Sequence, residues 1–411
     1  MRKTTAEAQP APSNAPGNVG DVRKANLARV LAVIAGAHSE HRLSRADIAT
    51  RSKLTKASVS SLVADLLESG LIIEIGVHRD GERGRPSVGL ILNPARCVIG
   101  MEINVDYISA GLVDLSGKLL THQIVPRLNR AVNAEQVIDA LSELSSQMQQ
   151  AAEAQDLKIL GGGLAVPGLV DEKSYTVLQA PNLGWEAQTL DVRKLLSETK
   201  TRFRLFNEAN ASALAQQQLM EPAERDFLFV SGEVGIGGGL IIDAELFAGP
   251  QGHAGELGHV VVQPEGKSCS CGGRGCLETV AGQEAILTAA NLGVAARGVS
   301  RQQRIERLYQ ALESGQEPAN IAVADAGKSL GVAVASAMRL FNVSTVVFGG
   351  HFAALERWLL PATTSSLRTY APSIAGQAKL RFSPLGQTGA LIGAAHSVVG
   401  DLLESPHQLV G

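Results

Sequence analysis

Three of the four cysteines in this 411-residue chain lie within eight residues, at Cys269, Cys271 and Cys276. His259 precedes them, so the four side chains follow the spacing His-x9-Cys-x-Cys-x4-Cys. One imidazole and three thiolates match a closed tetrahedral zinc site of the Cys3His type. The alternative is a cluster of buried free thiols. Four glycines would let the loop bend around an ion: Gly266, Gly272, Gly273 and Gly275.

Length and composition favour a large globular chain of two or three domains. Hydrophobic residues make up 45% of the sequence and charged residues 19%, and the sequence shows no apolar run near 20 residues. A membrane span is therefore not expected. The first 20 residues have a basic start without an apolar segment behind it, which predicts a disordered tail at 1–20 and a cytoplasmic protein.

Charge is distributed unevenly along the chain. Residues 1–94 contain 13 Lys and Arg against 9 Asp and Glu, whereas the rest contains 24 against 31. A basic N-terminal part is compatible with a polyanionic partner, although an excess of this size also arises by chance.

The pattern of residues 21–92 is typical of a winged helix-turn-helix. Apolar residues at helical spacing start near Val22, Ser44 can cap a second short helix, and Thr55 can cap a third that Gly70 ends. The start of the third helix would face DNA with small polar and basic groups. The DNA-contacting residues predicted there are Thr55, Lys56, Ser58 and Ser60.

Two strand-like runs after Gly70 flank a turn rich in arginine and glycine, which predicts the wing. Arg83 and Arg85 lie in this turn on the extended stretch "RGRP". Such an arm can enter a narrow A·T-rich minor groove. The alternative for residues 21–92 is a helical protein-interaction domain with a solvated basic loop.

Residues 95–405 alternate strand-like runs, glycine turns and helices, which predicts an α/β domain. Its motifs include "VPGLVD", "APNLGW", "NEANASALA", "VGIGGGLI", "GHAGELGH", "CSCGGRGCLE" and "VVFGG". In this order they resemble the ROK family, named for repressors, open reading frames and kinases that act on sugars. The resemblance covers residues 20–400 and implies a two-lobed, actin-like (ribonuclease H-like) domain. The family's repressors, unlike its kinases, add an N-terminal winged helix.

The resemblance also assigns roles to the polar residues of these motifs. It implies that the metal is one structural Zn²⁺ per chain, held by His259 and the three cysteines. The residues that it places around a monosaccharide are Gly168, Asn182, Asn207, Glu208, Glu256, His259 and Glu278. His259 would give one nitrogen to zinc and turn its other edge to a sugar hydroxyl. Taken alone, Glu256 or Glu278 could equally be a surface carboxylate.

Two departures from the family's kinases favour a regulator over an enzyme. Kinases of this family carry Asp-x-Gly-x-Thr on the first strand, where this chain has Glu102, Asn104 and Asp106. A carboxylate at position 106 would repel ATP phosphates. Glu208 stands where the kinases place their aspartate general base, and its longer side chain would displace the carboxylate.

The sequence therefore predicts a DNA-binding transcriptional regulator that responds to a sugar, a repressor of genes for carbohydrate use, and not an enzyme. Its expected partners are double-stranded operator DNA, a monosaccharide effector and further copies of itself, as a homodimer or a dimer of dimers. Two alternatives stay open. One is an ATP-dependent ROK sugar kinase with an added DNA-binding domain, and the other is a repressor controlled by a protein partner.

Overall fold

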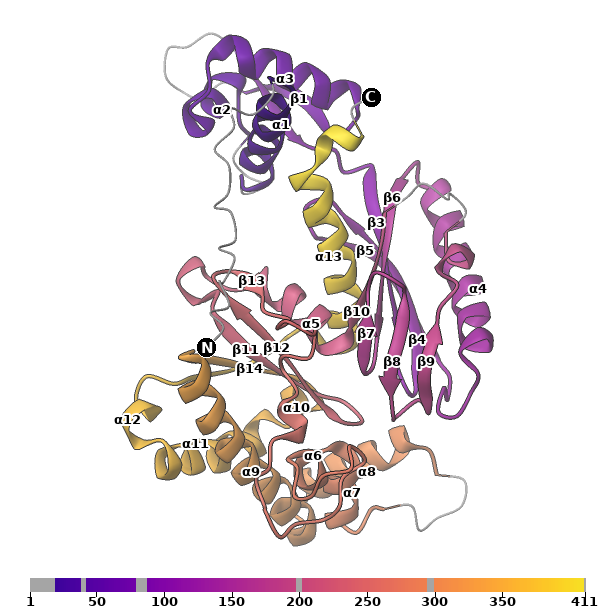
Figure 1. Ribbon diagram of the computed structural model, residues 1–411, viewed down its shortest axis with the longest axis vertical. Coiled ribbons are helices and arrows are strands. Elements are labelled where there is room, and N and C mark those ends of the chain that lie inside the picture. The colour runs from indigo at the N-terminus through magenta and orange to yellow at the C-terminus, as the bar shows by residue number, and fades with distance from the viewer. Residues whose placement is uncertain (1–18, 38–41, 79–86, 197–201, 294–298, 410–411) are drawn as a thin grey trace, which may run out of the picture. The chain divides into compact units, whose positions relative to one another are not determined.

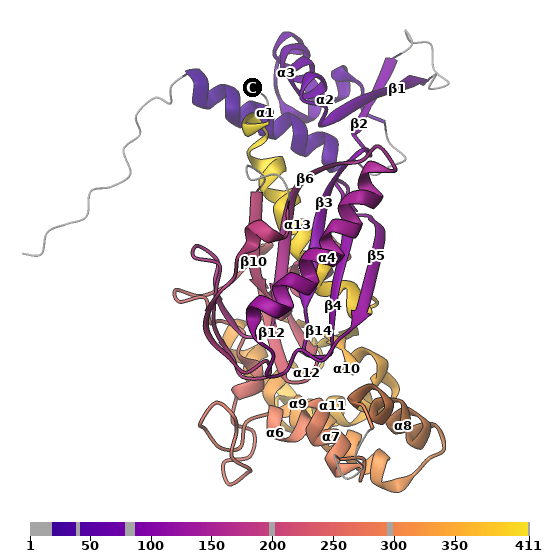
Figure 2. The same ribbon diagram turned by 90° about the vertical axis from the view of Figure 1, so that its right-hand side faces the viewer.

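The structure is a computed structural model whose elements are drawn in Figures 1 and 2. It describes residues 19–37, 42–78, 87–196, 202–293 and 299–409. The chain forms two compact units, one made of Met1–Asn93 with Gly400–Gly411 and the other of Pro94–Val399. The expected tail at 1–20 lies almost entirely outside the described residues.

The first unit is built from helices followed by a strand pair. Its elements in order are α1 (Val19–Ala35), α2 (Arg45–Ser52), α3 (Lys56–Glu68), β1 (Ile72–His78) and β2 (Ser87–Leu92). Ser44 caps α2 in a capping box with Asp47, and the Thr55 hydroxyl accepts the backbone N–H of Ser58 at the start of α3. These caps confirm the helix starts predicted from the sequence.

The helices of the first unit enclose a small apolar core. One face of α3 is buried, as are Ile48 and Ala49 of α2. The buried residues of α3 are Val59, Leu62, Val63 and Leu66. Strands β1 and β2 pair antiparallel, as expected for a wing. The segment between them, in which the sequence predicts a turn with Arg83 and Arg85, lies outside the described residues.

The second unit contains two five-stranded sheets with the same topology. The first sheet has the order β10-β6-β3-β4-β5 and the second has the order β13-β12-β11-β14-β15. In each sheet the first three strands in sequence form an antiparallel meander, and the fourth and fifth add parallel to the first. This repeat defines a first and a second lobe and agrees with the expected two-lobed, actin-like fold.

The strands and helices of the first lobe precede those of the second. The first lobe contains β3 (Arg96–Ile103), β4 (Tyr107–Asp114), β5 (Leu119–Pro126), α4 (Ala134–Glu153), β6 (Lys158–Val166) and β10 (Arg202–Asn207). A small antiparallel sheet in this lobe consists of β7 (Leu169–Asp171), β8 (Thr176–Ala180) and β9 (Trp185–Thr189). Helix α5 (Glu208–Gln217) then leads into the second lobe.

The second lobe carries most of the helices. Its strands are β11 (Phe227–Gly232), β12 (Ile236–Ile242), β13 (Glu245–Leu246), β14 (Thr345–Gly350) and β15 (Lys379–Phe382). Its helices are α6 (Glu278–Ala281), α7 (Gln283–Ala289), α8 (Arg301–Glu313), α9 (Glu317–Phe341), α10 (His351–Ala354), α11 (Glu356–Tyr370) and α12 (Pro372–Ala375). The last helix of the chain is α13 (Gly389–Glu404).

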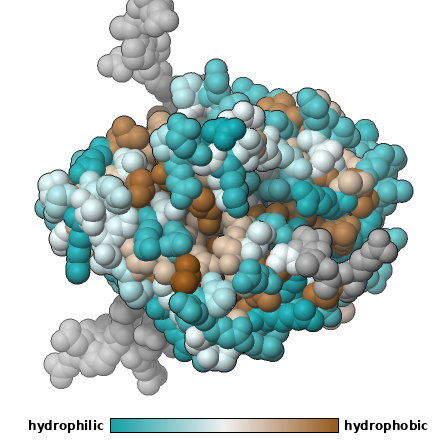
Figure 3. Space-filling model, turned by 90° about the horizontal axis from the view of Figure 1, so that it is seen from below, coloured by the Kyte–Doolittle hydropathy of each residue, from teal (hydrophilic) through white to brown (hydrophobic). Residues whose placement is uncertain are grey.

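Helix α9 is long and apolar enough to cross a membrane by length and composition, but 67% of its most apolar window is buried inside the protein. It packs along α11 as a core helix of the second lobe. Figure 3 views the molecule from below Figure 1 and shows a mixed face, with hydrophobic residues gathered in patches among hydrophilic ones.

The structure corrects one expectation about the first lobe. From the sequence alone, the apolar run before the turn at Ser116–Gly117 is predicted to be one strand, but the chain forms two antiparallel strands, β3 and β4, in this stretch. The Asn104 side chain accepts the backbone N–H of Asp106 and so stabilises a tight turn. Polar residues in the middle of an apolar run thus end one strand and begin the next.

Helices α5 and α13 cross at very close range. A Cβ atom built on Gly393 of α13 would lie 1.6 Å from the carbonyl oxygen of Ala211 in α5. On the same helix, Leu391 and Ala394 pack on the first sheet, where Gly100 and Gly163 leave room for the backbone. Position 393 therefore accepts only glycine without movement of the helices.

We expect Gly393→Ala to destabilise the protein by about 1–3 kcal/mol, because the added methyl group forces two packed helices apart. Gly400→Ala on the same helix is the matched control, since a Cβ there meets nothing within 4 Å. The control should be neutral or stabilising by up to about 1 kcal/mol. Chemical denaturation of both variants measures the difference, and equal midpoints would contradict the close crossing.

Candidate functional site

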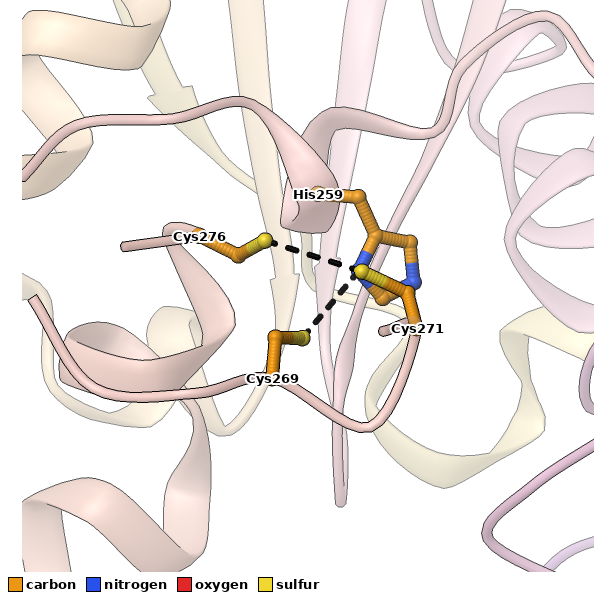
Figure 4. Close-up of side chains that lie close together, drawn as sticks. All are labelled: His259, Cys269, Cys271 and Cys276. Carbon is orange, nitrogen blue, oxygen red and sulfur yellow. Dashed lines mark hydrogen bonds between the residues drawn. The ribbon is translucent and has the colours of Figure 1, made fainter. Parts of the chain in front are cut away.

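Four potential metal ligands converge in the second lobe. Figure 4 shows the His259 imidazole and the thiols of Cys269, Cys271 and Cys276 pointing toward one another. Their ligand atoms all lie within 4.8 Å of one another. The Cys271 and Cys276 sulfurs are 3.7 Å apart. Two sulfurs that each bind zinc at about 2.3 Å in a tetrahedron would lie about 3.8 Å apart, so this cluster can bind a metal ion.

The loop that carries the cysteines is shaped by its own backbone. The Cys269 N–H donates to the carbonyl of Gly273 at 2.9 Å. Gly272 and Gly275 have φ angles of 88° and 75°, which a side chain would disfavour. At Gly275 a Cβ would also lie 1.7 Å from the Gln263 carbonyl oxygen. The predicted need for glycine is confirmed at these two positions.

Cys276 is the buried member of the cluster and Cys271 is exposed. Burial raises the pKa of the Cys276 thiol to about 12. A bound divalent cation would offset this cost, since a coordinating thiol loses its proton. The fourth cysteine of the chain, Cys97, is fully buried in β3.

The two nitrogens of His259 face different partners. Nδ1 lies 3.6 Å from the Cys269 sulfur, whereas Nε2 lies 3.8 Å from a carboxylate oxygen of Glu256. A metal-binding histidine commonly has a carboxylate at its second nitrogen, which fixes the orientation of the ring. The metal cluster is thus in direct contact with one of the residues predicted to bind sugar.

Three of the predicted sugar residues meet at the N-terminus of α5. The Asn207 side chain caps this helix by accepting the N–H groups of Ala209 and Asn210. Its amide nitrogen donates to the Gly168 carbonyl at 2.9 Å and to a Glu208 carboxylate oxygen at 3.3 Å. Gly168 has a φ of 92°, and a Cβ there would lie 2.1 Å from a backbone oxygen of β8.

Two more predicted residues converge on the glycine-rich turn before β12. A carboxylate oxygen of Glu278 accepts the Ile236 N–H at 3.1 Å. A Cβ built on Gly235 would lie 2.2 Å from that oxygen and 3.2 Å from the Asn182 amide nitrogen. Asn182 comes from the first lobe and Glu278 from the second, so the glycine lets the lobes approach each other here.

The seven predicted residues therefore gather where the lobes meet, and we call them the interlobe site. They are Gly168, Asn182, Asn207, Glu208, Glu256, His259 and Glu278. Glu256 acts electrostatically on both Glu208 and Glu278, which links the two groups. Burial, followed by repulsion from Glu102 and Glu256, raises the pKa of Glu208 to about 8. The site offers carbonyl and carboxylate acceptors with an amide donor, a set suited to hydroxyl groups.

Sequence reasoning missed a group of charged residues beside the interlobe site. Glu233, just before the glycine-rich turn, has its pKa raised to about 8 by burial and by Glu102 and Glu208. Arg301 of α8 reaches Asp106 of the first lobe at 3.0 Å and is nearly buried. These partners are 195 residues apart in the chain, so no local pattern could have revealed them.

The residues predicted to contact DNA lie together at the exposed start of α3. Thr55, Lys56, Ser58 and Ser60 are all exposed. The Thr55 and Ser58 hydroxyls lie 2.9 Å apart within the cap, and the Ser60 hydroxyl donates to the Lys56 carbonyl. Thr55 therefore has a structural role in the cap that the sequence already indicated, and the exposed Lys56 begins the helix.

Buried acids at the lobe junction make stability depend on pH. Glu208 and Glu233 lose their protons near pH 8 in the folded chain but near their ordinary pKa of 4.5 when it unfolds. The folded state then binds more protons, so the free energy of unfolding falls as pH rises through this window. His351 and His396, whose pKa burial lowers from 6.5 to about 4, have the opposite effect below pH 6.5.

We therefore expect the melting temperature to fall between pH 6.5 and 8, by about 2–4 °C for each kcal/mol lost. Glu233→Gln should flatten this decline, because the amide has no proton to release. Glu306→Gln, an exposed glutamate of α8, is the control that should behave as wild type. Melting curves across this range measure the slopes, and identical slopes for the two variants would contradict the raised pKa of Glu233.

Comparison with known proteins places the chain in a family. Residues 98–400 match the ROK family. The xylose repressor of Caldicellulosiruptor bescii is 29% identical over 377 residues, which cover 89% of this chain and 93% of the repressor. Among solved structures, a ROK family transcriptional regulator, a homologue of the Escherichia coli MLC protein, is 26% identical with a TM-score of 0.77, covering 95% of this chain and 99% of the regulator.

A kinase of the same family matches a shorter part of the chain. The ROK glucokinase of Streptomyces griseus, solved with glucose and AMPPNP, is 26% identical with a TM-score of 0.62. The match covers 98% of the glucokinase but 73% of this chain, whereas the regulator covers 95%. Because the family match spans well over half of the sequence, the chain belongs to the ROK family.

Proposed function

We propose that this protein is a sugar-responsive transcriptional repressor of carbohydrate-use genes. One observation carries the proposal: a unit with a capped helix-turn-helix and a strand pair precedes a ROK domain in the same chain. This unit makes the chain longer than the ROK glucokinase, whose match covers 73% of it. The similar regulator structure, that of a ROK family transcriptional regulator, matches 95% of the chain.

Helix α3 is the proposed recognition helix. Its first turn presents Lys56 together with the small side chains of Ser58 and Ser60, which allow close approach to base edges and phosphates. Arg83 and Arg85 would reach the neighbouring minor groove from the turn between β1 and β2. The operator would be double-stranded and would contain two half-sites for a homodimer, or four for a dimer of dimers.

The interlobe site is the proposed monosaccharide site. Its acceptors come from both lobes, so a bound sugar would contact both at once. The metal cluster would hold one structural Zn²⁺ per chain, which fixes His259 and through it Glu256. The relatives named as xylose repressors support a sugar effector. A soluble regulator of this kind would act in the cytoplasm, at the chromosome.

Phosphoryl transfer is the rival function, and the structure offers a reason against it. Asp106 occupies a position where the family's kinases have a phosphate-binding threonine, and it is tied to Arg301 across the lobes. Glu102 and Glu233 add two more carboxyl groups nearby. ATP phosphates would be repelled by these acids, and the guanidinium of Arg301 is already paired with Asp106. Control by a protein partner is the other alternative, which a failure to bind any sugar would favour.

We expect the purified protein to contain one zinc ion per chain. Cys271→Ser should lose the metal and lower the melting temperature by about 5 °C or more, because a zinc loop without its ion loses its order. Ser270→Ala is the matched control, since it changes the exposed neighbour of two ligands. Elemental analysis and melting curves provide the readouts. Well-folded wild type without zinc would refute the proposed cofactor.

The function is tested by operator binding with and without sugar, after operator fragments have been selected from genomic DNA. Lys56→Ala should weaken binding to all sequences alike and reduce the salt slope by about 1, because it removes one phosphate contact. Glu256→Ala should bind DNA normally but need about 10-fold more sugar to respond, because hydrogen bonds to hydroxyls are lost.

Two exposed residues of the ROK domain supply the controls for these variants, Lys118→Ala and Glu245→Ala. Both should keep the wild-type affinity for DNA and the wild-type response to sugar. An equal sugar response from Glu256→Ala and Glu245→Ala would remove Glu256 from the site. Sugar-dependent release of ADP from ATP, lost in Glu208→Ala, would establish the kinase function in place of the proposed one.

A further inference from the structure

The last helix of the chain belongs to both compact units. Helix α13 runs without interruption from Gly389 to Glu404, whereas the division between the units falls between Val399 and Gly400. Residues 389–399 are therefore part of the ROK domain, and residues 400–404 are part of the unit that carries the proposed recognition helix. The chain passes between the units at one other place, between residues 93 and 94.

The end of the chain completes the core of the first unit. The short 3-10 helix η5 (Pro406–Gln408) packs on α1. Its first residue, Pro406, is buried, and Leu402 of α13 is 1% exposed. Helix α1 contributes buried side chains to the same unit, among them Leu27 and Leu31. The DNA-binding unit is thus built from both ends of the chain.

The ROK end of α13 lies directly on the first sheet. Gly163 of β6, Gly100 of β3 and Gly111 of β4 form a row across the sheet, since Gly100 pairs with both of the others. A Cβ on Gly100 would lie 2.1 Å from the carbonyl oxygen of Leu391, and one on Gly163 would lie 2.2 Å from that of Ala394. This row of glycines brings the helix backbone onto the strands, a contact that resists small displacements.

Helix α5 has the corresponding position on the second sheet, and it begins at the interlobe site. A Cβ on Gly239 of β12 would lie 2.6 Å from the Cβ of Ala213 in α5. Asn207 caps α5 and Glu208 is its first residue, and both belong to the interlobe site. A displacement of the second lobe would therefore move the helix that begins at this site.

The crossing at Gly393 joins these two helices. Ala211, whose carbonyl oxygen would lie 1.6 Å from a Cβ on Gly393, is one turn beyond Glu208. The helix that starts at the interlobe site thus touches the helix that enters the DNA-binding unit. The other connection between the units leads into β3, and none of the seven residues of the interlobe site belongs to β3.

We propose that α13 is the connector through which the lobe arrangement at the interlobe site controls the DNA-binding unit. This inference rests on the proposed sugar-responsive function and adds the route of the response. A shift of α5 would pass to α13 at the tight crossing, and the hydrogen-bonded helix would carry it to η5 and α1. A sugar that binds two lobe arrangements unequally would in this way change the affinity for DNA.

Position 400 allows the connector to be broken at the division between the units. A Cβ there meets nothing within 4 Å. Gly400→Pro removes a helical hydrogen bond and kinks the helix at this point, because proline lacks an N–H and its ring clashes with the preceding turn. Gly400→Ala is the matched control, since alanine favours a continuous helix.

The first test measures operator affinity with and without sugar. The sugars are glucose, xylose and N-acetylglucosamine, the last two being named in the repressors similar to this chain. We expect sugar to change the operator affinity of wild type and Gly400→Ala by about 5–150-fold. Gly400→Pro should bind the same sugar equally well in calorimetric titrations, but the ratio of its operator affinities with and without sugar should fall toward 1.

The second test needs no sugar. Gly393→Ala disturbs the crossing and should change operator affinity by about threefold or more, because a shifted α13 alters the DNA-binding unit. In the Gly400→Pro background the same substitution should have little effect. If Gly393→Ala does not fold, Val398→Ala replaces it, since it loosens the contact of α13 with Gly161.

A second connector variant guards against misfolding of Gly400→Pro. The insertion Gly-Ser-Gly-Gly after Gly400 interrupts the helix without a proline, and the same insertion after Gly315, in an exposed turn, is its control. Melting curves establish that each variant is folded at the temperature of the binding assays.

The outcomes separate this inference from the proposed function. A full sugar response in Gly400→Pro would overturn the connector and leave the sugar-responsive regulator standing. Loss of operator binding in both folded connector variants would reduce the end of the chain to a structural part of its unit and would also overturn the route. A wild type whose operator affinity responds to none of the three sugars would count against the proposed function. The sugar-free test would then decide the inference, and an equal effect of Gly393→Ala in both backgrounds would refute it.

Discussion

The orientation of one imidazole ring connects the cysteine cluster to the interlobe site. His259 turns Nδ1 to the three thiols and Nε2 to Glu256. If a metal holds the first nitrogen, the second keeps a fixed direction, and the neighbouring carboxylate gains a fixed partner. The loop can be irregular and rich in glycine because the ligand set, and not a sheet or helix, would define its shape.

Repulsion among acids is the second constraint on the site. Burial raises the pKa values of Glu102, Glu208 and Glu233, and repulsion from neighbouring acids adds to the rise at Glu208 and Glu233. The protein satisfies Asp106 with Arg301 but provides no such partner for the other three within its described residues. Carboxyl groups at this lobe junction disfavour an anion such as the phosphates of ATP.

The sequence predicted those structural features that depend on residues close together in the chain. The caps at Ser44 and Thr55 and the turns at Gly272 and Gly275 are local, and the structure confirms them. The interlobe residues were predicted through family motifs, because their contacts join segments from position 168 to position 278. Neither a local sequence pattern nor a family motif indicated the ion pair between Asp106 and Arg301. The turn at Asn104 was missed because flanking apolar residues hid a change of strand.

Acidic residues lie on both lobes of the duplicated fold, so their charges affect how closely the lobes can approach each other. Glu102 and Glu208 belong to the first lobe, whereas Glu233, Glu256 and Glu278 belong to the second. Any motion that brings the lobes together therefore brings like charges together and costs energy unless the carboxyl groups are protonated or paired. A ligand that donates hydrogen bonds or carries positive charge removes more of this cost in a closed arrangement than in an open one. That difference in affinity between two arrangements is what a ligand needs in order to shift an equilibrium. The close crossing of α5 and α13 at Gly393 would limit any such motion to arrangements that preserve this contact.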